Sequence, residues 1–232
     1  MSLNMPWFDQ VKAEKLVLNI LKDLQTIQTD IHKNVIDPFS SLFEAAVNSY
    51  TYDSWINAEV MRQKQKTLTN KIGHLHEELL ACIIGVENLA KGLVVDILCE
   101  QKSIIAEVKN KFNTTKGNHK KEIYDDLSKL IDEKYHGFTG YYVEIIPKNP
   151  VRYNKQFTPS DNTTKSNRKG RDDIRIIDGY SFYSLLTGDE NALFKIHQFV
   201  IKKLSEKMNL ESIYKFEELF NKAYGNPINR YF

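Results

Sequence analysis

The sequence predicts an α/β protein, on the borderline with α+β, in which helices flank a small mixed β-sheet and an N-terminal region is helical. Apolar residues recur at spacings of three and four in the N-terminal third and again near the C-terminus, which indicates amphipathic helices. Between these parts, short runs rich in β-branched and aromatic residues are typical of strands. With 232 residues, the chain can bury a full core.

We expect a single domain over residues 1–232, made of three parts. The first part, 1–70, is a helical N-terminal region, and the second, 71–180, holds the strands and forms the core of the domain. The third part, 181–232, consists of C-terminal helices. Runs of helices on both sides of a strand-rich segment favour one layered domain over two small ones.

One apolar stripe predicts the first helix, and its members are Leu16, Ile20, Leu24, Ile27 and Ile31. Asp37 and Pro38 end this helix, because the residue before a proline is restrained away from helical geometry. A second helix is expected over 39–49. A third begins at Asp53 or Ser54, which can cap it.

Gly73 is expected to separate the third helix from a fourth, which Gly85 ends. The elements expected after it are a hairpin over 92–111, a basic helix over 120–135, a strand over 138–147, a long loop over 148–172, a strand over 173–179, and helices from residue 180 onward.

Composition excludes some classes of protein. The longest apolar run is far short of the ~20 residues that cross a bilayer, and no signal-peptide pattern opens the chain. Cys82 and Cys99 sit among apolar neighbours and are expected to be reduced core thiols of a cytoplasmic protein. No glycine-rich phosphate loop and no Ser-His-Asp or Cys-His arrangement is apparent.

The net charge of +2 is uninformative, but the positive charges are unevenly distributed. The segment Lys109–Lys121 has five lysines and no acidic residue, and Arg152–Arg175 has seven Lys or Arg against three Asp. Two separate basic segments favour a phosphate-rich partner. Two solvated loops would explain the same pattern.

The segment IIAEVKNK, residues 104–111, places two charges in an apolar strand. If the hairpin closes with a two-residue turn, or with a four-residue loop, Asp96 lies directly opposite Glu107, and Lys109 shares their face. The opposite face is expected to pack into the core and is made of Val95, Ile97, Cys99, Ile104, Ala106 and Val108.

Two like charges facing each other in an apolar setting repel, and a divalent cation between them removes the conflict. Carboxylate oxygens at this separation suit Mg²⁺, for which Mn²⁺ can substitute. Lys109 beside the pair can then contact an attacking water or a phosphate. The alternative is a diagonal salt bridge between Asp96 and Lys109 with Glu107 pointing to water.

The pattern Asp…Glu-x-Lys resembles the PD-(D/E)xK nuclease superfamily and is carried here by Asp96, Glu107 and Lys109. The residue before the Asp is Val95, where the family pattern has proline. The resemblance also implies an acidic residue on a helix before the hairpin, for which Glu77 is the better candidate and Glu78 the other.

Three longer blocks, RQKQKTLTNKIGHLHEELL, AEVKNKFNTTKG and FYSLLTGDENALFKI, resemble a family of type II restriction endonucleases that cut GGNCC- or GGWCC-type sites. They fall between about Asp37 and Ile196. The resemblance implies a restriction-endonuclease-like core, Mg²⁺ dependence, a homodimer on double-stranded DNA and a restriction-modification system in a prokaryotic cell. It implies neither a membrane nor a small-molecule cofactor.

For such an enzyme, Asp96, Glu107 and the backbone carbonyl of Val108 are expected to hold the metal ion. Lys109 is expected to orient or deprotonate the water that attacks in line with the departing 3′ oxygen. Residues expected to hold the DNA backbone are Lys111, Asn113, Thr114 and Lys116. Residues expected to read bases from the long loop are Arg152, Lys155, Asn167, Arg168, Lys169 and Arg171.

Alternatives remain at this stage. The long loop could be a solvated insertion without a DNA contact. His74 and His76 with Glu77 could suggest a different metal site, but positions two apart on a helix point to different sides. The chain could also be a repair, recombination or modification-dependent nuclease with the same core, or a DNA-binding protein without catalysis.

Overall fold

The structure is a computed structural model that describes residues 3–26, 31, 34–89, 94–161, 164–208 and 213–225. The chain divides into two compact units. The sheet unit comprises 1–17 and 74–232, and the helical unit comprises 18–73. This division falls close to the expected boundary at residue 70, but the first 17 residues belong with the sheet. Whether the whole chain acts as one domain stays a prediction.

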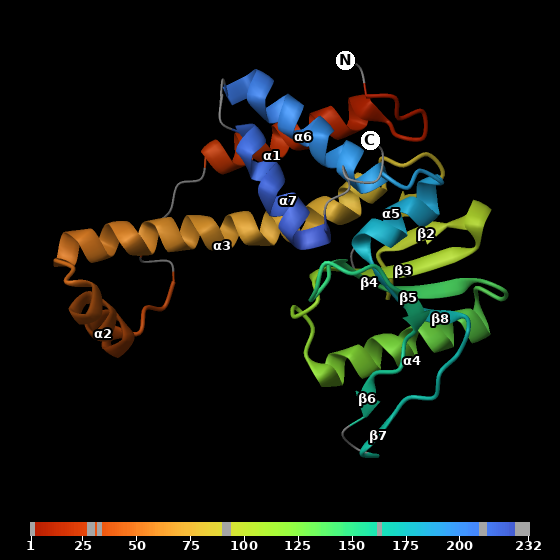
Figure 1. Cartoon of the computed structure of the whole chain (residues 1–232). Coiled ribbons are helices and arrows are strands. Elements are labelled where there is room, and N and C mark those ends of the chain that lie inside the picture. The colour runs from red at the N-terminus through yellow and green to blue at the C-terminus, as the bar shows by residue number, and fades with distance from the viewer. Residues whose placement is uncertain are drawn as a thin grey trace. The chain divides into compact units, whose positions relative to one another are not determined.

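The sheet unit is built on a six-stranded mixed sheet of order β1-β2-β3-β4-β8-β5 (Figure 1). Its strands are β1 (Glu87–Asn88), β2 (Ile97–Cys99), β3 (Ile104–Lys111), β4 (Thr139–Ile146), β8 (Ile174–Asp178) and β5 (Asn154–Gln156). The three central strands, β3, β4 and β8, run parallel, and the outer strands pair antiparallel. The predicted mixed α/β class is confirmed.

Helices cover both faces of this sheet (Figure 1). The helices of the sheet unit are α4 (Gly117–Glu133), α5 (Gly179–Thr187), α6 (Ala192–Met208) and α7 (Glu217–Tyr224). On one face, Leu127 of α4 packs with Ile105 and Tyr142 of the sheet. On the other face, Phe182 of α5 belongs to the same core cluster as Ala106.

Two long helices link the units, because α1 (Gln10–Gln25) and α3 (Tyr52–Leu80) each belong partly to both. The helical unit also holds α2 (Pro38–Asn48), whose N-cap Asp37 accepts a hydrogen bond from the Phe39 N–H at 2.9 Å. The expected break at this proline is therefore a helix start. Ile27, the fourth member of the predicted stripe, lies outside the described residues.

The predicted break at Gly73 is wrong, because α3 continues through it as one helix of 29 residues. A single glycine inside a helix costs only about 1 kcal/mol relative to alanine, which the packing of a long helix can offset. Of the later elements, the basic helix begins at Gly117, three residues before the expected start. The C-terminal part is helical as expected.

The predicted hairpin register is confirmed. Ile97 pairs with Ala106, and Cys99 pairs with Ile104, around a four-residue loop. That loop is a 3₁₀ turn, Glu100–Lys102, followed by Ser103 at a positive φ of 52°.

The expected start of the first hairpin strand is wrong, because β2 begins only at Ile97. Val95 therefore does not share the face of Ile97, as the alternation predicted. It packs instead in the cluster that contains Leu98 and Ile105. Strand alternation does not extend to residues that precede the strand.

The segment 148–172, expected to lack regular structure, contributes three short strands. Strand β5 adds to the edge of the main sheet, and β6 (Ser160–Asp161) pairs with β7 (Ser166–Asn167) as a separate hairpin. Both cysteines are buried free thiols. Within the described parts of the chain, no helix is both long and apolar enough to cross a membrane.

Gly179, the first residue of α5, touches the backbone of β4. A Cβ at this position would lie 2.5 Å from the Ile145 carbonyl oxygen and 2.6 Å from the Ile145 Cα. We expect Gly179→Ala to lower the free energy of unfolding by more than about 2 kcal/mol, since neither backbone can move without disturbing the sheet. Urea denaturation followed by circular dichroism measures this.

Gly73→Ala is the matched control, because a Cβ there meets nothing within 4 Å. In the interior of α3 this change is expected to stabilise by about 0.5–1 kcal/mol. Equal unfolding midpoints for the two variants would contradict the close approach of α5 to β4.

Candidate active site

Asp96 stands at the point where β2 stops covering β3. Its backbone N–H donates to the Ala106 carbonyl at 2.9 Å, and its side-chain Oδ2 accepts from the Val108 N–H at 2.7 Å. The carboxylate therefore replaces the backbone carbonyl that would accept the next hydrogen bond from β3 in a continued antiparallel pairing. Since the N–H and C=O of one strand residue point to the same side, the Val108 carbonyl is also directed to this edge of β3.

Glu107 and Lys109 follow on the α4-facing side of β3. The Lys109 Nζ forms a salt bridge with Glu107 Oε1, and the Glu107 side chain is only 13% exposed. Lys109 thus pairs with Glu107, and not with Asp96 as in the diagonal alternative.

The carboxylates of Asp96 and Glu107 repel each other. Burial, followed by repulsion from the Asp96 charge, raises the pKa of Glu107 to about 7, although the Lys109 ammonium acts in the opposite direction. The two carboxylates are also close enough to share a proton. This place in the sheet carries more negative charge than its surroundings stabilise.

Glu77, near the end of α3, belongs to the same electrostatic group. Burial and then the Asp96 charge raise the pKa of Glu77, whereas a hydrogen bond to His74 and the Lys109 charge lower it. The His74 Nδ1 lies 3.3 Å from Glu77 Oε2. Glu78 is exposed, so the structure favours Glu77 of the two candidates.

The two histidines of this helix do not form a shared metal site, because they contact different residues. Burial lowers the pKa of His76 to about 4, and its Nδ1 lies 3.2 Å from the Tyr183 hydroxyl. His76 is therefore a neutral core side chain, whereas His74 contacts Glu77. Among the residues that the structure describes, no group of three His, Cys, Asp or Glu side chains converges on one point.

A second charged cluster lies on β4, one strand away, and the sequence reasoning missed it. Glu144 is the neighbour of Lys109 in the parallel register. Its Oε1 accepts from the Lys120 Nζ at 2.6 Å, and its Oε2 accepts from the Tyr153 hydroxyl at 2.6 Å. The missed signal was the carboxylate inside the apolar run YYVEII, the same anomaly that singled out Glu107.

The basic segment after β3 is exposed and leads into α4. Lys111 ends the strand and Lys116 is the N-cap residue of α4, so the segment follows directly from the carboxyl end of β3. Lys111, Asn113, Thr114 and Lys116 are all exposed. The Thr114 hydroxyl donates to the Lys111 carbonyl at 2.6 Å, which tightens the turn.

The predicted base-reading residues divide into three groups. Arg168 pairs with Asp125 at 2.6 Å, and Arg171 donates two hydrogen bonds of 2.9 Å to Asp132, so both hold the long loop on α4. Arg152 stacks on the Tyr180 ring, 3.4 Å from its centroid. The exposed members are Lys155, Asn167 and Lys169.

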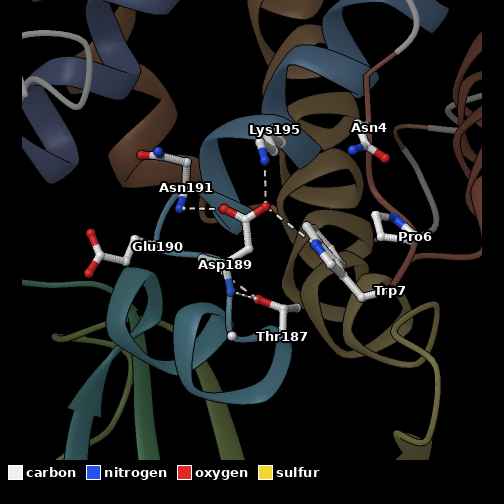
Figure 2. Close-up of a pocket in the computed structure, with 9 residues that line it drawn as sticks. Asn4, Pro6, Trp7, Thr187, Asp189, Glu190, Asn191 and Lys195 are labelled. Atoms are coloured by element: carbon white, nitrogen blue, oxygen red, sulfur yellow. Dashed lines mark hydrogen bonds and ion pairs between the residues drawn. The ribbon is translucent and has the colours of Figure 1, made fainter. Parts of the chain in front are cut away.

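A pocket of about 440 Å³ lies apart from these residues, between the N-terminal segment and the turn from α5 to α6 (Figure 2). Asp189 at its centre accepts from the Lys195 Nζ at 2.5 Å, the Trp7 Nε1 at 3.3 Å and the Asn191 N–H at 2.9 Å. Its carboxylate is thus satisfied by the chain itself, and no candidate catalytic residue lines the pocket. We interpret the pocket as a structural contact between the N-terminal segment and the turn from α5 to α6.

Comparison with known proteins identifies the class. The mixed sheet flanked by helices is consistent with the restriction-endonuclease-like fold. The Eco47II restriction endonuclease family matches residues 6–209. The chain belongs to this family, and it is a type II site-specific deoxyribonuclease.

Two curated relatives agree. The chain is 40% identical over 189 residues to the type II restriction enzyme Eco47II of Escherichia coli. The aligned residues cover 80% of this chain and 79% of the relative. It is 31% identical over 215 residues to the type II restriction enzyme Sau96I of Staphylococcus aureus, covering 88% and 82%. The predicted family is therefore confirmed.

The raised pKa of Glu107 predicts a pH-dependent stability. Folded Glu107 binds more protons than unfolded Glu107 between its ordinary pKa of 4.5 and about 7, so metal-free protein loses stability as pH rises through that window. Glu107→Gln removes this loss. In EDTA we expect the variant to exceed the wild type at pH 8 by up to about 3 kcal/mol, with a smaller difference at pH 5.

Glu100→Gln is the control, because Glu100 is an exposed carboxylate in the turn of the same hairpin. Its unfolding free energy should follow that of the wild type at both pH values. If the stability advantage of Glu107→Gln over the wild type did not grow from pH 5 to pH 8, that result would contradict the raised pKa of Glu107.

Proposed function

We propose that this enzyme cuts both strands of DNA at GGNCC- or GGWCC-type sites, as a Mg²⁺-dependent homodimer in the cytoplasm of a prokaryotic cell. The observation that carries the proposal is the carboxylate pair of Asp96 and Glu107 beside Lys109, at an edge of β3 that β2 leaves open. The relatives support the recognition site, since Eco47II recognises GGWCC and Sau96I recognises GGNCC.

The donor set at this edge fits Mg²⁺. Asp96 and Glu107 repel each other, and a cation between them would take the place of the proton that they are close enough to share. The Val108 carbonyl is directed to the same side, and Mg²⁺ prefers a few protein oxygens with several waters retained. Bound there, Mg²⁺ or Mn²⁺ would polarise the phosphoryl oxygen and lower the pKa of a bound water.

Lys109 would orient or deprotonate the attacking water. Its ammonium is held beside the carboxylates by the salt bridge to Glu107, so it can orient the water or, once deprotonated, take its proton. The water oxygen then attacks phosphorus in line with the departing 3′ oxygen, and the P–O3′ bond breaks. Glu77 would add negative charge that strengthens cation binding.

The exposed segment from Lys111 to Lys116 would hold the DNA backbone, which positions the duplex without reading it. Arg152, Lys155, Asn167 and Lys169 remain the proposed source of base contacts. Arg168 and Arg171 would read bases only if DNA acceptors replaced their carboxylate partners on α4, so their first role is to fix the loop.

A homodimer follows from the symmetry of the proposed site. Two half-sites related by a two-fold axis are read most simply by two copies related by the same axis, each cutting one strand. Such an enzyme would require a companion methyltransferase to protect the DNA of its own cell.

Digestion of a plasmid of known sequence tests the proposed function. We expect discrete bands in Mg²⁺, with every mapped end at a GGNCC or GGWCC sequence, and no cleavage in EDTA. Excess Mn²⁺ should restore cutting. Failure to cut in either metal would overturn the proposal, and ends at unrelated sequences would overturn the recognition site alone.

Lys109→Ala tests the role of the lysine. We expect cleavage to slow by at least about 1,000-fold, because the water loses its orienting and proton-accepting group. DNA affinity measured in EDTA should change less than about tenfold. Rates come from single-turnover digestion and affinities from fluorescence anisotropy.

Lys102→Ala serves as the control for the loss of one positive charge, since Lys102 is exposed in the turn of the same hairpin. It should cut at the wild-type rate. Comparable slowing of both variants would point to a general charge effect, and the specific role of Lys109 would be lost.

A further inference from the structure

Glu144 is a charged residue that the fold alone does not require. It is 6% exposed and lies between Val143 and Ile145 in the centre of the sheet. Replacing a buried ion pair by apolar residues of similar volume is often neutral or stabilising, so an ion pair at such a place is weak evidence of a stabilising role. The question is what the carboxylate holds in position.

Glu144 holds Lys120. The Lys120 Nζ lies 2.6 Å from Glu144 Oε1 and 3.4 Å from the Phe112 carbonyl oxygen, and 5.1 Å from the centre of the Tyr142 ring. In the parallel register, Glu144 is the neighbour of Lys109, and Tyr142 is the neighbour of Glu107. The ammonium of Lys120 therefore lies one strand away from the proposed catalytic pair.

Lys120 keeps the capacity to bind an anion. An ammonium has three N–H donors, and the contacts to Glu144 and Phe112 use two of them. Its side chain is 24% exposed, so the third donor can reach a ligand from solvent.

The N-terminus of α4 adds positive potential at the same place. Its N-cap residue Lys116 makes no side-chain capping hydrogen bond, and no acidic residue occupies the first turn. The backbone N–H groups and the dipole at a helix N-terminus favour an anion. Lys120 projects from this first turn.

Two buried hydroxyl groups lie near each other beside this end of the helix. Thr115, directly before the N-cap, is 8% exposed, and Tyr142 is fully buried, yet neither hydroxyl has a partner at ordinary hydrogen-bond geometry. They lie close enough for Thr115 to lower the pKa of Tyr142, which burial raises. Buried polar groups are nearly always satisfied, so this pair calls for an explanation.

From these observations we propose that Lys120 binds a phosphate of the DNA backbone next to the scissile one. Glu144 and Tyr153 are positioning residues that hold its ammonium in place. The phosphate oxygens would accept hydrogen bonds from the Lys120 ammonium, from the N-terminus of α4 and from the Thr115 hydroxyl. This inference rests on the proposed nuclease function and adds a contact to it.

Tyr153 gives the arrangement a link to the long loop. Its hydroxyl donates to Glu144, and its N–H donates to Asp178 Oδ2 at 2.8 Å, while Asp178 also caps α5. Arg152, the adjacent residue, is one of the proposed base-reading residues. A movement of this segment on DNA binding would therefore change the position of Glu144 and, through the ion pair, that of the Lys120 ammonium.

Lys120→Met tests the phosphate contact. Each neutralised phosphate contributes about 0.9 to the slope of log affinity against log salt concentration, so the slope should fall by about that amount in EDTA. The single-turnover cleavage rate in Mg²⁺ should fall by about 100-fold or more. The probe is a duplex that carries one GGWCC sequence.

Lys129→Met is the matched control on the same helix. Lys129 is exposed and lies nine residues further along α4, which places it on the opposite side of the helix. Its salt slope and cleavage rate should equal those of the wild type. A Lys120→Met variant that matches the wild type in both measurements would overturn the inference.

The positioning role is tested by combining variants. If Glu144 acts through Lys120, Glu144→Gln should slow cleavage when it is introduced alone and add little in the Lys120→Met background. The same holds for Tyr153→Phe. Independent structural roles would instead give additive losses, and that result would overturn the positioning role.

Wild-type protein provides a measurement that does not depend on the folding of variants. In EDTA, the duplex should protect Lys120 from acetylation relative to Lys129, as mass spectrometry can quantify. Equal modification of Lys120 with and without DNA would overturn the inference. Wild-type protein that binds the duplex but never cuts it would overturn the proposed function instead, whatever the state of Lys120.

Discussion

The hydrogen bond from the Val108 N–H to the Asp96 carboxylate is the contact on which the candidate site depends. Because β2 begins only at Ile97, the edge of β3 beyond Ala106 has no strand partner on that side among the described residues. An open edge exposes backbone groups that need a partner. Asp96 supplies one with its side chain, and this brings a charge next to Glu107 inside the sheet.

The sequence alone was sufficient for the register and for the charged face of β3. Apolar residues on both hairpin strands restrict the pairing, since a slip of one residue would move each side chain to the other face. It was not sufficient for the start of β2. Val94 and Val95 have high strand propensity, but the backbone bonds to β3 end with the Asp96 N–H on the Ala106 carbonyl, and the Asp96 side chain makes the next contact.

The parts that sequence reasoning missed share one cause, which is partners distant along the chain. Glu144 takes its partners from α4 and from the long loop, 24 and 9 residues away. Without those partners in view, the run YYVEII predicts only a strand. Arg168 and Arg171 were expected to face DNA because their carboxylate partners lie about 40 residues earlier, on a helix whose placement over the sheet is a tertiary property.

The charges around the site explain why its substrate and its proposed cation would depend on each other. The carboxylates are Asp96, Glu107, Glu77 and Glu144, and the ammonium groups beside them are Lys109 and Lys120. Burial and then the Asp96 charge raise the pKa of Glu107, and the excess of negative charge would repel a phosphodiester. A divalent cation would offset the excess, and a bound phosphate would then replace the negative charge that the cation neutralised. Each would therefore lower the electrostatic cost of binding the other, so binding of metal and DNA at this edge of β3 would be cooperative.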